Sequence, residues 1–157
     1  MGDLQMRRAR RDDVAAIVRL LFDDELGRTR EVLSDPPDAA YLAAFDAIEG
    51  DANQLLAVAA WRGVADIVGC LQVTFIPGLS HRGLWRGQIE SVRVASTARG
   101  TGLGREMIAW AIEQCRQRDC GMVQLTSTAS RTDARRFYET LGFEATHVGF
   151  KLDLRRS

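Results

Sequence analysis

Three glycines at alternate positions, Gly100, Gly102 and Gly104, constrain the fold of this chain more than any other feature of its sequence. They lie directly between an apolar segment with strand character and the start of a helical pattern. Glycine permits a positive φ and leaves the backbone amides open, and the first turn of a helix presents unpaired N–H groups and a positive dipole end. The cluster therefore predicts a phosphate-binding turn between a strand and a helix, and a glycine-rich turn without a ligand is the alternative.

The spacing around the glycines disfavours two familiar phosphate-binding motifs. A P-loop requires Lys followed by Ser or Thr after its glycines, and no such pair follows here. A dinucleotide fingerprint that begins at Gly100 requires a glycine where this sequence has Arg105. It also requires an acidic residue about 20 positions further on, within a βαβ unit, and that region holds Asp119 beside Cys120. The expected ligand is therefore neither ATP nor NAD.

Hydrophobic periodicity predicts elements in the order β, α, α, β, β, β, α, β, α, β, which is typical of an α/β (α+β) domain with a mixed sheet. No repeat, low-complexity run or linker divides the chain, so residues 1–157 are expected to form a single domain. The expected strands are Leu4–Ala9, Leu55–Trp61, Ile67–Ile76, Gln88–Val94, Met122–Thr126 and Thr146–Leu154. The expected helices are Val14–Leu21, Ala39–Ile48, Leu103–Cys115 and Ala134–Leu141, the last of them capped by Gly142.

Charge and hydropathy exclude several classes of protein. Twenty-one basic residues balance 21 acidic ones, so no overall positive field exists to hold a nucleic acid. The apolar stretches are far shorter than the roughly 20 residues that span a bilayer, and the charged N-terminus has no signal-peptide core, so a cytoplasmic protein without membrane contact is expected. No metal site is expected, because the cysteines lack C-x-x-C spacing and His81 and His147 have no ligand partners near them in the sequence.

Two segments resemble the cofactor motifs of the GNAT superfamily of N-acetyltransferases. The run QIESVRVASTARGTGLGREMI, from Gln88 to Ile108, is similar to its acetyl-CoA-binding motif [QR]-x-x-G-x-[GA], which Arg99, Gly102 and Gly104 fill. The run ARRFYETLGF, residues 134–143, is similar to its second motif, A-x-x-F-Y-x-x-x-G-F. The resemblance extends over residues 4–154 and implies the GNAT fold, a mixed central sheet of about six to seven strands flanked by about four helices.

The resemblance implies transfer of the acetyl group of acetyl-CoA to a primary amine by direct attack in a ternary complex, without a covalent enzyme intermediate. A non-catalytic CoA-binding regulatory or interaction module of the same fold is the alternative. The chain departs from the family pattern at Ser96, where many members have proline, and at Arg131, where many have asparagine. A homodimer is possible by the same analogy. The residues implied in cofactor binding are Val92, Arg93, Val94, Arg99, Gly100, Thr101, Gly102, Leu103, Gly104, Arg105 and Arg131.

Two further residues are candidates for proton transfer. Two-residue alternation places Glu90 on one strand face with Val92 and Val94, beside the implied cofactor edge. Burial there would raise the pKa of its carboxyl and make it a base for an ammonium, directly or through water; an exposed or Arg-paired structural glutamate is the alternative. By resemblance, the Tyr138 hydroxyl donates to the leaving thiolate, and a core tyrosine is the alternative. The acceptor can be a small amine, an antibiotic, an amino acid or a protein amine.

Overall fold

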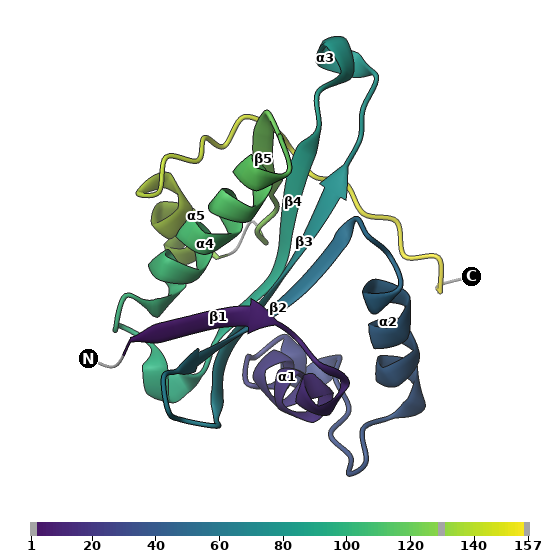
Figure 1. Cartoon of the computed structure of the whole chain (residues 1–157), viewed down its shortest axis with the longest axis vertical. Helices are drawn as coiled ribbons and strands as arrows, with labels where there is room; N and C mark the ends of the chain where they lie inside the picture. The colour runs from purple at the N-terminus through teal and green to yellow at the C-terminus, as the bar shows by residue number, and fades with distance from the viewer. Residues whose placement is uncertain (1–2, 129–130, 156–157) are drawn as a thin grey trace. The chain divides into compact units, whose positions relative to one another are not determined.

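The computed structural model describes residues 3–128 and 131–155 (Figure 1), which form two compact units. The first unit extends to Gln124 and the second begins at Leu125. The first unit contains nearly all of a five-stranded sheet, in which the strands lie side by side in chain order. The strands are β1 (Leu4–Arg8), β2 (Gln54–Trp61), β3 (Ile67–Ile76), β4 (Arg86–Val94) and β5 (Met122–Leu125).

The sheet is mixed, as the sequence predicts. Strands β1 to β4 pair antiparallel with their neighbours. Beside β4, the Gly121 amide donates to the Trp85 carbonyl at 3.0 Å, and further along both strands Gln124 Nε2 donates to Gln88 Oε1 at 2.7 Å. Since these contacts advance in the same direction along both strands, β5 runs parallel to β4. The long helix between these two strands provides the crossover that a parallel pair requires.

Helices cover both sides of the sheet in the first unit. Helices α1 (Val14–Phe22) and α2 (Ala39–Glu49) lie on one side and α4 (Leu103–Gln117) on the other (Figure 1). The one-turn α3 (Ser80–Gly83) lies at the tip of the β3–β4 hairpin. Within the described ranges, no helix combines the length and the apolar character needed to cross a membrane.

Helix α4 packs its predicted face against the sheet. Leu103, Met107 and Cys115 are at most 1% exposed, which confirms the periodicity argument for this helix. A Cβ at Gly69 in β3 would lie 2.6 Å from Met107 Sδ. Glycine at this position therefore lets the helix approach the strand closely.

The second unit contains α5 (Thr132–Glu139). Gly142 follows the helix with a φ of 89°, which confirms its expected role in ending the helix. The Tyr138 ring makes edge-to-face contacts with Phe137 and Phe143, at centroid distances of 5.2 and 5.9 Å. The aromatic residues of the second motif thus form a local cluster.

The expected last strand, Thr146–Leu154, does not form, and the sheet has five strands rather than six to seven. The segment does alternate, with Val148, Phe150, Leu152 and Leu154 at every second position, but these side chains are 81–93% exposed. Alternation alone does not make a strand, because a strand requires a neighbour to complete its hydrogen bonds. Among the described residues this segment has no ladder partner.

Candidate active site

Strand β4 carries a bulge at Ser91, a non-glycine residue with a φ of 53°. Gln72 in β3 faces Glu90, whereas Cys70, two positions before Gln72, faces Arg93, so β4 contains one extra residue here. Paired residues of antiparallel strands point to the same side of the sheet. Glu90 and Arg93 therefore share one side.

The expectation that Glu90, Val92 and Val94 share one face is wrong. Val94 faces Gly69, which lies on the opposite side of β3 from the partners of Glu90 and Arg93. The extra residue breaks the two-residue alternation on which the expectation depended. Glu90 is also exposed, so the burial expected around its carboxyl is not observed.

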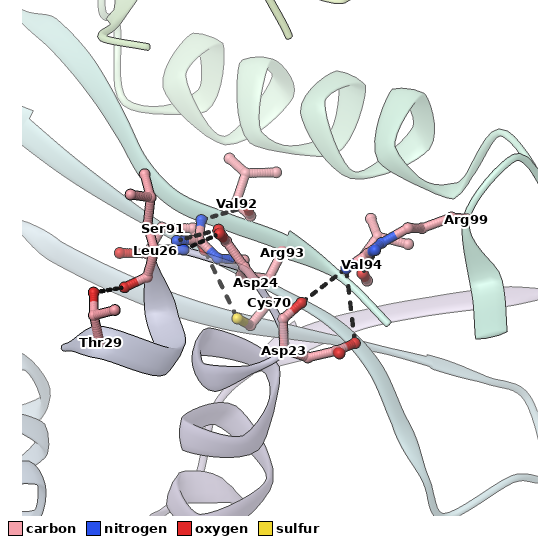
Figure 2. Close-up of polar contacts among 10 residues, drawn as sticks. All are labelled: Asp23, Asp24, Leu26, Thr29, Cys70, Ser91, Val92, Arg93, Val94 and Arg99. Carbon is pink, nitrogen blue, oxygen red and sulfur yellow. Dashed lines mark hydrogen bonds and ion pairs between the residues drawn. The ribbon is translucent and has the colours of Figure 1, made fainter. Parts of the chain in front are cut away.

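The bulge contacts a buried thiol. Cys70 Sγ lies 3.7 Å from the Ser91 carbonyl oxygen, to which it donates (Figure 2). Burial raises the pKa of Cys70 to about 12, against a smaller opposing effect of the Arg93 charge. The thiol therefore keeps its proton and remains a donor to the bulge.

Arg93 directs its side chain to the segment that follows α1. Arg93 Nη2 lies 3.4 Å from Asp24 Oδ2, and the two side chains are 23% and 12% exposed. Arg93 Nη1 also donates to the Val92 carbonyl at 3.0 Å, and Asp24 Oδ1 accepts from the Leu26 amide at 2.9 Å (Figure 2). The Arg93 guanidinium is thus held by Asp24.

The glycine cluster forms the turn that the sequence predicts. After the short 3-10 helix Ser96–Ala98, Gly100 and Gly102 adopt φ values of 77° and 87°, and Gly102 is the N-cap of α4. A Cβ at either glycine would meet nothing within 4 Å, so this side of the turn is open. Thr101 Oγ1 donates to the Ala98 carbonyl at 2.7 Å and braces the turn from within.

The amides of this turn are available to a ligand. In the part of the chain that the structure describes, the N–H groups of residues 100–104 donate to no protein acceptor. They lie at the N-terminus of the 15-residue helix α4, where the helix dipole favours an anion. Within the described ranges, the turn thus combines unpaired amides with open space at the Cβ positions of Gly100 and Gly102, and this combination fits a pyrophosphate group.

Asp23, at the end of α1, holds the start of this turn. Its Oδ2 accepts from the Ser96 amide at 3.3 Å. Its carbonyl accepts from Arg99 Nη2 at 2.9 Å (Figure 2). The Arg99 guanidinium also lies 3.7 Å from the Asp23 carboxylate and donates through Nε to the Val94 carbonyl at 3.4 Å. The side chain of Arg99 therefore joins the end of β4 to the end of α1.

Sequence reasoning missed both Asp23 and Asp24. A signal for them was present, because the C-terminus of a helix disfavours acidic side chains unless they have partners elsewhere. Two consecutive aspartates directly after the apolar face of α1 therefore indicate long-range ion pairs. The identity of the partners could not be read, since Arg93 and Arg99 are far away in the sequence.

Tyr138 and Arg131 belong to the second unit. Tyr138 is half-buried within its aromatic cluster. Arg131 is exposed at the N-cap of α5, and its amide donates to the Thr128 carbonyl at 2.9 Å. In the first unit, by contrast, the structure brings residues 92–94 and 99–105 together where β4 ends and α4 begins.

Comparison with known proteins identifies relatives of this chain. The sequence profile of the Acetyltransferase (GNAT) family matches residues 14–143. The glucosamine 6-phosphate N-acetyltransferase of Trypanosoma brucei brucei is 30% identical over 152 residues, which are 97% of each chain. The aminoalkylphosphonate N-acetyltransferase of Salmonella typhimurium is 34% identical over 70 residues, 45% of this chain and 46% of that protein.

A solved structure resembles the whole chain. The crystal structure of a transcriptional regulator from Bacillus halodurans is 45% identical and superimposes with a TM-score of 0.93. The match covers 97% of this chain and 100% of the other. The same arrangement of strands and helices therefore exists in a crystallised relative.

Proposed function

Because this chain belongs to the GNAT acetyltransferase family and is an acetyl-CoA-dependent N-acetyltransferase, we propose that it acetylates a primary amine by direct attack in a ternary complex. The observation that carries the proposal is the open turn of residues 100–104, whose free amides lie at the start of α4. The family profile crosses the boundary between the two units, which supports one domain over residues 1–157.

The proposed cofactor site consists of two adjoining segments. Backbone groups of residues 92–94, just beyond the bulge, hold the pantetheine arm, and the turn holds the pyrophosphate. Acetyl-CoA supplies an activated acetyl thioester when bound. The turn residues proposed are Arg99, Gly100, Thr101, Gly102, Leu103, Gly104 and Arg105, and Arg131 is proposed as a further phosphate contact.

Two residues are proposed to move protons. Glu90 accepts a proton from the substrate ammonium, directly or through water, and its exposure leaves the carboxylate open to an incoming amine. Tyr138 donates its hydroxyl proton to the departing thiolate, and its edge-to-face contacts restrict the orientation of the ring. The Tyr138 role follows the family resemblance, whereas the Glu90 role rests on an exposed carboxylate in β4, near the proposed cofactor edge.

The acceptor is proposed to carry a phosphate or phosphonate group in the same molecule as its amine. The names of two relatives specify substrates of this kind. In this chain, Arg28 and Arg30 are exposed after α1, around the 3-10 helix Gly27–Thr29, and within the described ranges neither has an ion-pair partner. Arginine binds such oxyanions through paired hydrogen bonds. A hollow of about 240 Å³ lies nearby, lined in part by Arg19, Val32 and Leu33.

Thiol release from acetyl-CoA over matched amine pairs tests both parts of the proposal. The pairs are glucosamine 6-phosphate with glucosamine, and 2-aminoethylphosphonate with ethylamine. We expect kcat/KM to be at least ~10-fold higher for the phosphorus-containing member of a pair, since charge-assisted hydrogen bonds contribute about 1.5–3 kcal/mol. Equal values would remove the oxyanion requirement and leave acetyl transfer intact. No turnover with any amine would favour the non-catalytic module, the alternative that the name of the Bacillus halodurans relative suggests.

A further inference from the structure

We propose that Asp23 and Asp24 form a clamp that couples the acceptor side of the site to the cofactor turn. The clamp consists of these two aspartates with Arg93 and Arg99, and it ties the end of α1 to both ends of the segment 93–99. This inference rests on the proposed function, because that function assigns the turn after residue 99 to acetyl-CoA.

The Asp24 half of the clamp fixes the end of β4. Arg93 Nε is buried without a hydrogen-bond partner among the described residues, so its guanidinium depends on Asp24 and on the Val92 carbonyl. A buried charge that loses its counterion is strongly destabilised. Asp24 therefore holds the residues just beyond the bulge, which are the ones expected to pair with the pantetheine arm.

The Asp23 half fixes the start of the turn. Asp23 accepts the Ser96 amide through its carboxylate and the Arg99 guanidinium through its carbonyl. Arg99 in turn donates to the Val94 carbonyl. Because the Arg99 side chain is directed to Asp23, Arg99 acts here as a positioning residue that orients the backbone of residues 100–104.

The same aspartates begin the segment that carries the exposed arginines. The Asp24 carboxylate accepts the Leu26 amide at 2.9 Å, and its carbonyl accepts the Arg28 amide at 3.0 Å. A ligand that orders the turn therefore also restricts residues 24–31 through the clamp. By thermodynamic linkage, each substrate then raises the affinity for the other by the same factor.

Hydrogen–deuterium exchange of the full chain, with acetyl-CoA as the probe, tests this coupling without relying on turnover. In the parent protein, acetyl-CoA should slow exchange over residues 24–31. Asp23→Ala, which removes the carboxylate that accepts the Ser96 amide and lies near Arg99, should weaken acetyl-CoA binding by about 2- to 10-fold, raise its KM with little change in kcat, and reduce the slowing. Asp23→Glu, which keeps a carboxylate at this position, should restore part of the slowing. Asp46→Asn in α2, which breaks an exposed ion pair with Arg11, is the matched control and should change none of these quantities.

The outcomes separate this inference from the proposed function. If acetyl-CoA binds the parent protein but leaves exchange over residues 24–31 unchanged, the clamp does not couple the two sides, and the cofactor site stands. If the slowing is as large in folded Asp23→Ala as in the parent protein, the clamp is likewise overturned. If acetyl-CoA does not bind the parent protein at all, the proposed cofactor turn is wrong and the clamp falls with it. Asp23 is suited to this test because its side chain is 40% exposed, so its substitution leaves the core intact.

Discussion

Replacing Gly102 with Glu tests the cofactor turn at its open side. Gly102 has a φ of 87° and free space where a Cβ would stand, at the N-cap of α4. An L residue in this conformation lowers the free energy of unfolding by roughly 1–2 kcal/mol. Gly63, between β2 and β3, has a φ of 79° and equally open surroundings. Gly63→Glu therefore carries the same backbone strain and the same charge without touching the turn.

The effect on binding should be confined to Gly102→Glu. Its carboxylate occupies the open side of the turn and displaces a phosphate oxygen from at least one of the free amides of residues 100–104. A hydrogen bond between an amide and a charged oxygen contributes roughly 1.5–3 kcal/mol. Since about 1.4 kcal/mol is a tenfold change, the Kd for acetyl-CoA should rise about 10- to 100-fold. Repulsion between the carboxylate and the pyrophosphate adds to this loss.

Titration calorimetry with acetyl-CoA measures the change, and thermal unfolding verifies that both variants are folded. The parent protein and Gly63→Glu should bind one acetyl-CoA per chain with equal affinity, and binding should raise the Tm of each. NAD and ATP should bind far more weakly. An unchanged Kd in folded Gly102→Glu would refute the assignment of the turn to the pyrophosphate, and tight binding of NAD would return the dinucleotide motif to consideration.

Three other substitutions test separate parts of the molecule. Glu90→Gln should keep its acetyl-CoA affinity but slow transfer by ~10²-fold and gain rate as pH rises; an unchanged rate and pH profile would make Glu90 structural. Tyr138→Phe should lower kcat by ~10²-fold in single-turnover assays while losing only about 1 kcal/mol of stability, whereas full activity would return Tyr138 to a packing role. Arg7 holds the pKa of the Asp13 carboxyl below its ordinary value through hydrogen bonds of 2.6 and 2.9 Å. The stabilisation by this pair is therefore complete above about pH 4 and is lost as pH falls through the lower pKa of the folded state. In urea unfolding, Asp13→Asn should be about 1–3 kcal/mol less stable than the parent at neutral pH, and a difference that does not shrink in acid would contradict the argument.

Local features of the sequence were sufficient to predict most elements and the glycine turn before α4. The apolar spacing of α4 is a property of one continuous segment, and its residues are buried as that spacing requires. The positive φ of Gly100 and Gly102 likewise follows from the residue type, because glycine adopts it without steric penalty. The glycine turn and the start of α4 are adjacent in the chain, so the sequence alone indicates that they occur together.

The tertiary structure decided what depends on distant partners. No glycine in the sequence indicates the bulge at Ser91. Because of this bulge, the side chain of Arg93 lies on the same side of the sheet as that of Glu90. The bonds from Asp23 to Ser96 and Arg99 join residues 73 and 76 positions apart, which no local periodicity can specify. The alternating residues 148–154 show the converse, because a strand pattern forms a strand only when another strand completes its hydrogen bonds. Conformations set by residue type are thus readable from the chain, whereas pairings between distant segments arise only when the fold brings those segments together.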